Sequence, residues 1–142
     1  MPHPGQVLEG PGGFRLTLVE LSEDALIMEA RYPGNGQMPP EHLHPSQHER
    51  FEVIEGRVRV VLDGEEHRYK AGAEFNVPAG TPHQMAADGE ALVAWEVRPA
   101  LRTAEFFERL YTEVLAGRLD NDGVAAFFDD FSDVFRFTAG RP

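Results

Sequence analysis

Short runs of alternating apolar and polar residues, separated by Gly, Pro, Asn or Asp, fill residues 1–99 of this 142-residue chain. Alternation with a period of two is typical of β-strands with one buried face, and frequent turn residues are typical of sandwiches or barrels of short strands. The spacing is dense enough to close into a small barrel. We therefore predict an all-β fold with strands over 14–19, 25–32, 49–55, 57–62, 65–70, 74–77, 82–87 and 91–98.

Two turn signals define how these strands connect. Asp63-Gly64 separates two alternating runs and predicts a type I′ hairpin, in which residues 57–62 pair with residues 65–70. The tetrapeptide Pro33-Gly34-Asn35-Gly36 ends the run over 25–32 and predicts a second turn.

The hydrophobic period becomes helical near Thr103. We predict one helix that begins at Thr103 as N-cap and ends near Gly117, and a second helix over about 122–135. Seven of the ten phenylalanines lie at or after Phe106, so these helices must bury an apolar face against the barrel or a second subunit. We expect a β-barrel over residues 1–100 and a helical extension of the same domain over residues 101–142.

Composition excludes several classes of function. With 13 basic and 24 acidic residues the net charge is −11, which disfavours binding to nucleic acid or to anionic membrane surfaces. The absence of cysteine excludes disulfides and thiolate metal sites. No apolar run approaches the roughly 20 residues that span a bilayer, and the N-terminus lacks the pattern of a secretory signal. We expect a cytoplasmic protein.

A metal site is predicted by the spacing of His42, His44 and Glu49. Histidines at i and i+2 of an extended segment point to the same face, so both imidazoles can approach one ion. In the next strand Glu49 shares the apolar face of Phe51 and Val53, where a carboxylate is costly unless it is paired or binds a metal. His48 has the opposite parity and is the alternative ligand to Glu49.

A second segment supplies a third imidazole. The turn Pro78-Ala-Gly80-Thr-Pro82 precedes a strand in which His83, Met85 and Ala87 share a face. His83 is therefore the candidate third nitrogen ligand.

The two segments together resemble the cupin superfamily in its small single-domain form. The first cupin motif, G-x5-H-x-H-x3–4-E-x6-G, is met at Gly36, His42, His44, Glu49 and Gly56. The second, G-x5-P-x-G-x2-H-x3-N, is met at Gly72, Pro78, Gly80 and His83, while Ala87 replaces the final Asn. The resemblance covers residues 10–98. It implies a cupin double-stranded β-helix, or jelly-roll barrel, with a metal held by His42, His44, Glu49 and His83.

Such a site suits a divalent transition metal with positions left for other ligands. Mixed nitrogen and oxygen donors fit Fe, Mn, Ni, Cu or Zn without selecting among them. The leading hypothesis is a small metal-dependent enzyme that binds a small oxygen-bearing organic substrate at the metal for dioxygenase-like oxidation, with Glu49 as ligand or general base. The alternatives are a metal-dependent isomerase or lyase, a non-catalytic sensor of small molecules or metals, and a structural metal site.

Other candidate residues have simpler interpretations. We expect His3 and His67 at the surface and Arg57 and Arg59 on a solvated face. Trp95 shares the parity of the inward-facing strand residues around it, so we expect a core residue. We also expect a homodimer, since cupins commonly pair barrel faces.

Overall fold

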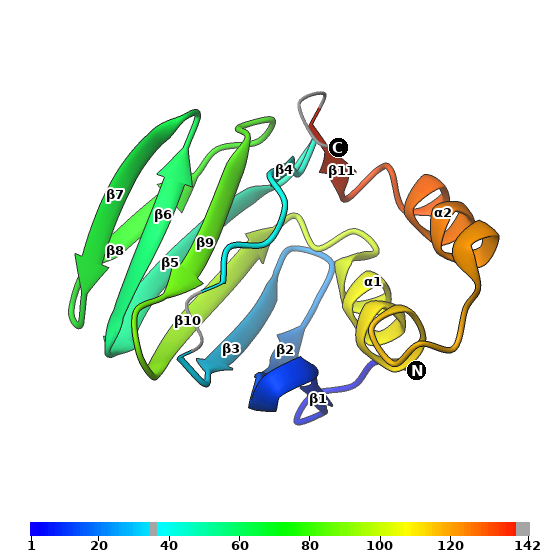
Figure 1. The fold of residues 1–142 in the computed structure, drawn as a ribbon, viewed down its shortest axis with the longest axis horizontal. Coiled ribbons are helices and arrows are strands. Elements are labelled where there is room, and N and C mark those ends of the chain that lie inside the picture. Colours follow the sequence, from blue (N-terminus) through cyan, green and yellow to red (C-terminus); the bar gives the residue numbers. More distant parts are fainter. Residues whose placement is uncertain (35–36, 139–142) are drawn as a thin grey trace.

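Two antiparallel β-sheets face each other in the computed structural model, which describes residues 1–34 and 37–138 (Figure 1). Gly36, the first position of the first cupin motif, lies outside the described residues, as does part of the turn expected at 33–36. The strands of the larger sheet are β1 (Val7–Glu9), β2 (Arg15–Leu21), β3 (Leu26–Tyr32), β5 (His48–Glu55), β8 (Glu74–Val77) and β10 (Ala91–Arg98). Those of the smaller sheet are β4 (His42–Leu43), β6 (Arg57–Leu62), β7 (Glu65–Lys70), β9 (His83–Ala87) and β11 (Arg136–Phe137).

The strand order shows how the chain winds between the sheets. The larger sheet has the order β1-β2-β3-β10-β5-β8 and the smaller one β11-β4-β9-β6-β7. The β6–β7 hairpin is confirmed, because Asp63 and Gly64 both have positive φ angles, as a type I′ turn requires. The eight predicted strands are present with small shifts at their ends, and the all-β prediction is confirmed. Strands β1 and β11 were not predicted.

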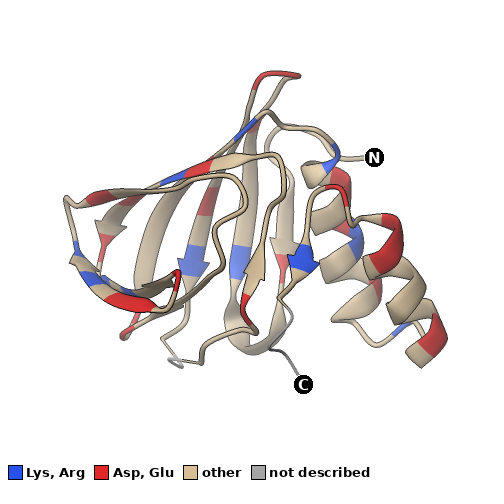
Figure 2. Ribbon diagram, turned by 90° about the horizontal axis from the view of Figure 1, so that it is seen from above, with Lys and Arg blue, Asp and Glu red and all other residues tan. Residues whose placement is uncertain are grey.

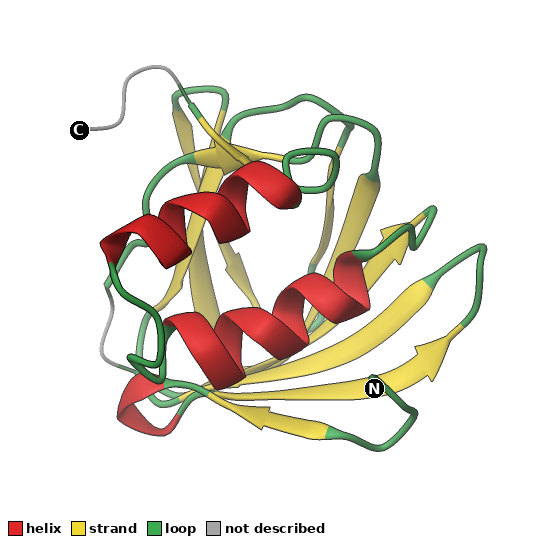
Figure 3. Ribbon diagram, turned by 90° about the vertical axis from the view of Figure 1, so that its right-hand side faces the viewer, coloured by secondary structure: helices red, strands yellow, loops and turns green. Residues whose placement is uncertain are grey.

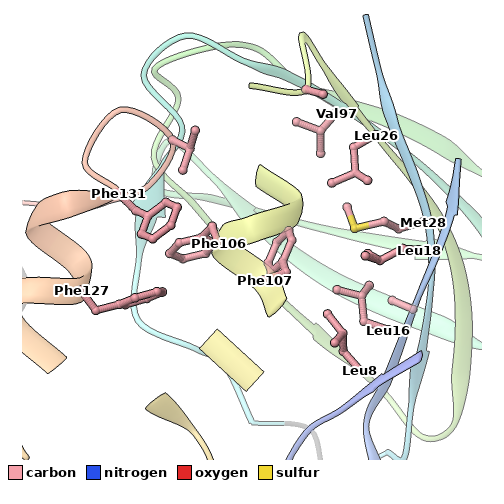
Figure 4. Packing of buried hydrophobic residues seen from close by; sticks show 13 residues of the cluster. Leu8, Leu16, Leu18, Leu26, Met28, Val97, Phe106, Phe107, Phe127 and Phe131 are labelled. Carbon is pink, nitrogen blue, oxygen red and sulfur yellow. The ribbon is translucent and has the colours of Figure 1, made fainter. Parts of the chain in front are cut away.

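The apolar core has two parts. One lies between the sheets and includes Phe51, Val53 and Val60, which confirms the inward parity predicted for Phe51 and Val53. The other lies between the larger sheet and the C-terminal helices, where Phe106 and Phe107 pack between α2 and strands β2 and β3 (Figure 4). Four phenylalanines of the extension, Phe106, Phe107, Phe127 and Phe131, are thus buried within the chain itself, while Phe128, Phe135 and Phe137 stay partly exposed.

Two helical segments form the extension and cover one end of the sandwich (Figure 3). Helix α1 (Thr103–Arg109) continues into a π-helical turn, η2 (Leu110–Val114), and α2 (Asn121–Asp130) follows. A single 3₁₀ turn, η1 (Pro11–Gly13), precedes β2. Gly117 has a positive φ of 73° just beyond η2, in agreement with its predicted place at the helix end.

Two predictions about the helices were wrong in detail. Thr103 is the first helical residue rather than the N-cap; Arg102 is the N-cap, and the Thr103 hydroxyl accepts a bond from Gln47 instead. The second helix ends at Asp130 rather than near Phe135, because the chain turns after Phe131 and enters β11. Its N-cap is Asp120, whose carboxylate accepts from the backbone N–H of Gly123 at 2.7 Å.

The acidic residues are spread over the surface rather than gathered on one face. Asp and Glu occur on both helices and on several strands (Figure 2), in keeping with the net charge of −11. No helix among residues 1–34 and 37–138 is long and apolar enough to cross a membrane.

Candidate metal centre

Three imidazoles meet where β4 pairs with β9. His42 stands directly opposite His83 across the two strands, and their ring centroids are 4.4 Å apart. His44, just beyond the end of β4, has its ring centroid 5.2 Å from each of the other two. One ring nitrogen from each histidine lies within 4.8 Å of the others. The i, i+2 spacing and the register between β4 and β9 together produce this cluster.

Glu49 reaches the same point from the opposite sheet. It is the second residue of β5 and its side chain is only 1% exposed, as the parity argument predicted. Its Oε1 lies 3.2 Å from Nε2 of His44 and 3.1 Å from Nε2 of His83. Metal–ligand bonds of about 2.0–2.2 Å put neighbouring ligand atoms about 3 Å apart, so these separations suit donors around one ion.

The other nitrogen of each imidazole faces a backbone carbonyl. Nδ1 of His42 lies 3.1 Å from the Pro40 oxygen, and Nδ1 of His83 lies 2.9 Å from the Thr81 oxygen. Nδ1 of His44 lies 2.7 Å from the Val134 oxygen. A carbonyl oxygen can only accept a hydrogen bond, so each Nδ1 carries the proton. The lone pairs on Nε2 are therefore left for a metal.

Two buried atoms at this point lack hydrogen-bond partners. Within the described residues, neither Nε2 of His44 nor Oε1 of Glu49 makes a hydrogen bond, although they are 3.2 Å apart. With Nδ1 protonated, a neutral imidazole presents a lone pair to a carboxylate lone pair, and a cation between them removes the repulsion. The donor set therefore fits a divalent transition metal, and three imidazoles with one carboxylate leave a net charge near +1.

The surroundings favour the ionised carboxylate of Glu49 and the neutral imidazole of His42, the forms that bind a metal, but they favour the protonated form of His44. Burial raises the pKa of the Glu49 carboxyl, but the imidazoles of His44 and His83 outweigh burial and bring this pKa well below its usual range. Burial and the neighbouring imidazoles lower the pKa of His42 to about 3. Burial also acts to lower the pKa of His44, but the Glu49 carboxylate outweighs it and leaves that pKa raised.

Trp95 has a role at the site that its sequence position alone did not indicate. It faces inward and stacks on Phe51 with centroids 5.3 Å apart, as expected of a core residue. Its indole N–H also donates to Oε2 of Glu49 at 2.8 Å. In the β5–β10 register Trp95 is opposite Phe51 and hence the diagonal neighbour of Glu49. Oε2 is occupied by this bond, so Oε1 is the oxygen left for a metal.

Three further residues at the site were missed by sequence reasoning. Gln47 is buried in the loop between His44 and Glu49, and its amide nitrogen donates to the Pro99 and Ala100 carbonyls and to the Thr103 hydroxyl. Val134 supplies the carbonyl that accepts from His44, and the Phe135 ring stacks on His42 with centroids 4.6 Å apart. The place of Gln47 between two candidate ligands in the sequence was a usable signal; the two tail residues had none.

The remaining candidates lie away from the centre. His48 is exposed, and its Nε2 donates to the Asn76 side chain at 3.0 Å. Its outward orientation agrees with its predicted parity. Arg59 forms an ion pair with Asp88 at 2.7 Å on the outer surface.

The comparisons with known proteins agree with this arrangement. The cupin domain family model matches residues 28–97, which include all four donors. A solved RmlC-like cupin protein from Desulfovibrio desulfuricans is 30% identical, with a TM-score of 0.54, over 61% of this chain and 82% of its own. The chain belongs to the cupin superfamily. The cupin double-stranded β-helix predicted from the two motifs is thereby confirmed.

Two curated relatives share part of this cupin. Quercetin 2,3-dioxygenase of Bacillus subtilis is 36% identical over 67 residues, which are 46% of this chain and 20% of the relative. The probable oxidoreductase yanE of Aspergillus niger is 36% identical over 93 residues, which are 58% of this chain and 36% of the relative. The cupin thus spans only a minor part of the length of either relative.

Proposed function

We propose that this cupin is a metal-dependent enzyme that binds a small oxygen-bearing organic substrate at its metal and promotes a dioxygenase-like oxidation. The observation that carries the proposal is the cluster of His42, His44 and His83, one ring nitrogen of each within 4.8 Å of the others, with Oε1 of Glu49 3.2 Å from Nε2 of His44 and 3.1 Å from Nε2 of His83. The likeness to a quercetin 2,3-dioxygenase and to a probable oxidoreductase supports oxidation as the class of reaction. His42, His44, Glu49 and His83 are the proposed ligands.

The chain's own residues have separable roles in this scheme. A bound Fe, Mn, Ni, Cu or Zn ion would supply Lewis acidity and, for the redox-active metals, an electron-transfer centre. The three carbonyls at Nδ1 hold the imidazoles in the tautomer that keeps Nε2 free. The Trp95 N–H holds Oε2 of Glu49, which leaves Oε1 for one of two roles: it would stay bound to the metal as a ligand, or, released from the metal, it would accept the proton of a substrate hydroxyl. The burial of His44, Glu49 and His83 keeps bulk water from the donors.

Metal analysis of ligand variants tests the donor set. His42→Ala and His83→Ala should each lose most of the metal affinity, because each removes one nitrogen from a four-donor site. His48→Ala is the matched control and should retain affinity, since its ring is exposed and faces Asn76. The measurement is metal content by mass spectrometry after loading and gel filtration. Equal losses in all three variants would contradict the donor set.

Turnover is tested separately with quercetin and with simple catechols as probes. We expect oxygen consumption by the protein loaded with Fe²⁺, Mn²⁺, Ni²⁺ or Cu²⁺ and none by the Zn²⁺ form or by His83→Ala, because redox chemistry needs a redox-active ion at the site. Exchange of water at the metal, without oxygen uptake on any probe or metal, would contradict the oxidative reaction and favour a binding function.

A further inference from the structure

The last described residues of the extension reach back to the metal centre. Strand β11 pairs with β4, with Phe137 opposite His42 and Arg136 opposite Leu43. The backbone N–H of Thr138 also lies 3.3 Å from the Glu41 carbonyl, and its hydroxyl donates to the Glu41 carboxylate at 2.8 Å. Residues 131–138, here called the tail segment, therefore lie along the strand that carries the first histidine.

Two contacts join the tail segment to the imidazoles themselves. The Val134 carbonyl accepts from Nδ1 of His44 at 2.7 Å, the shortest of the three Nδ1 contacts. The Phe135 ring lies nearly parallel to the His42 ring, at 4.6 Å between centroids and 18° between planes. Phe135 also lies edge-on to His44, at 6.0 Å and 68°.

The tail segment is held from behind by the helices. Phe135 stacks on Phe106 of α1 with centroids 5.0 Å apart, and Phe106 is 1% exposed. Arg102 donates to the Asp130 carbonyl at 2.5 Å and to the Asp133 carboxylate at 2.7 Å. The extension therefore forms a continuous packed connection from the barrel core to the outer faces of His42 and His44.

We infer that Phe135 and the Val134 carbonyl are positioning residues of the metal centre, and that the extension sets metal affinity by fixing the orientation of the His42 ring and the tautomer of His44. The inference rests on the metal ligation proposed above. Groups that orient ligating histidines typically change metal affinity about 10–100-fold when removed. Coupling is reciprocal, so a bound metal must also stabilise the docked tail segment.

Three variants separate positioning from mere packing. Phe135→Leu removes the ring over His42 but keeps an apolar side chain, and we expect Zn²⁺ affinity to fall about 10-fold. Phe127→Leu is the matched control. It removes a more deeply buried ring, 2% exposed, from the same cluster, with no ring contact to Phe135 or an imidazole among those in the described part of the chain. Phe127→Leu should leave affinity close to wild type although it unfolds more easily, and Phe135→Tyr should restore affinity.

Two measurements without turnover complete the test. Nitrogen-15 NMR of the metal-free protein should show bare Nε2 on His42 and His44 in wild type and in Phe127→Leu. In Phe135→Leu it should show a mixture of tautomers on His44, because its carbonyl partner Val134 adjoins Phe135. Zn²⁺ should slow amide hydrogen exchange in residues 131–138 of wild type more than in residues 121–126.

The outcomes distinguish this inference from the proposed function. If wild type binds Zn²⁺ and Phe135→Leu binds it equally well, or if affinity follows stability across the three variants, the positioning role is overturned and the ligand set stands. If wild type binds neither Zn²⁺ nor any redox-active ion, the ligand set falls and the positioning role falls with it.

Discussion

The indole of Trp95 determines which oxygen of Glu49 is available. Trp95→Phe keeps the ring stacked near Phe51 but removes the donor to Oε2. We expect metal affinity to fall about 10-fold, because the carboxylate is then free to rotate. We also expect the metal-free protein to lose about 1–3 kcal/mol of unfolding free energy, because a buried acceptor loses its partner. Competition with a coloured chelator and urea unfolding measure the two effects.

Phe107→Leu is the control for this substitution. Phe107 contacts the Trp95 ring edge-on at 5.1 Å and has no ring contact with a donor histidine in the described part of the chain. It should lower stability without lowering metal affinity. If Phe107→Leu and Trp95→Phe weaken metal binding equally, the hydrogen bond to Oε2 has no role in it.

Side-chain parity was enough to predict the four converging residues, whereas their hydrogen-bond partners were not predictable. Alternation along a strand puts Glu49 on the face of Phe51 and Val53, and the apolar character of those two residues predicts that this face is inward. The Val134 carbonyl lies 90 positions from His44 along the chain, and every residue has a carbonyl, so no residue type marks this contact. Trp95 was predicted as core but not as a donor, because the register that makes it a diagonal neighbour of Glu49 is a tertiary property.

The connection between β5 and β6 depends on a glycine that touches neighbouring backbone. Gly56 has a φ of 81°, and a Cβ there would lie 2.2 Å from the Glu90 carbonyl oxygen. Gly72 has a similar φ of 94° but open space around it. Both Gly→Ala substitutions incur the left-handed backbone cost of about 1–2 kcal/mol. Gly56→Ala should cost about 1–3 kcal/mol more than Gly72→Ala, because backbone must move.

Urea unfolding of the two glycine variants checks this difference. Both positions share the cost of a positive φ angle, so the difference between their losses of unfolding free energy reports the close approach of Gly56 to Glu90. Equal losses would show that the β5–β6 turn relaxes at no cost.

The turn after α2 has a pH-dependent ion pair. The Arg102 guanidinium bonds to the Asp133 carboxylate and holds its pKa below the usual value near 3.8. Because the folded state lowers the pKa of this carboxyl, the ionised Asp133 stabilises the folded state above pH 3.8. This stabilisation is lost as the pH falls through the folded-state pKa. We therefore expect wild type to be more stable than Asp133→Asn at pH 7, and the difference to shrink as the pH falls below 3.8.

Urea midpoints of both proteins at pH 7 and through the range below pH 3.8 measure the effect, with 1 M NaCl as a control that should shrink it. The difference should be small, because the Asp133 side chain is 48% exposed. A difference that persists at low pH would assign it to packing rather than charge.

The C-terminal end of the second helix could not be predicted from the hydrophobic pattern. Apolar residues at helical spacing continue through Val134 and Phe135, so the pattern alone extends the helix too far. Val134 is buried in the core and Phe135 packs on Phe106 and His42, and the chain leaves the helix after Asp130 to reach these positions. The strands were predicted closely because each has a turn signal at its end.

Metal loading is expected to stabilise the whole molecule. An ion that binds only the folded state at 100 times its Kd adds about 2.7 kcal/mol, which raises Tm by roughly 8 °C for a chain of this size. Calorimetry with Zn²⁺ and with excess EDTA measures the shift. His83→Ala should show no metal-dependent shift; an equal shift in that variant would place the stabilising ion elsewhere.

The expected homodimer stays a prediction. Part of the phenylalanine-rich face is buried against the chain's own barrel, with Phe106, Phe127 and Phe131 each at most 2% exposed, while Phe128, Phe135 and Phe137 are partly exposed. Pairing of barrel faces and these partly exposed rings are the basis for the expected dimer. Light scattering should give twice the monomer mass, and a monomer at all concentrations would contradict it.

Trp95 is the chain's single tryptophan, and its indole is bonded to the carboxylate at the centre of the proposed site. The protein's ultraviolet fluorescence therefore comes from a fluorophore in direct contact with that site. Arrival of an ion beside Glu49 changes the electric field at the excited ring, and a coloured or paramagnetic ion quenches its emission. Occupancy can thus be followed in unlabelled protein, in real time.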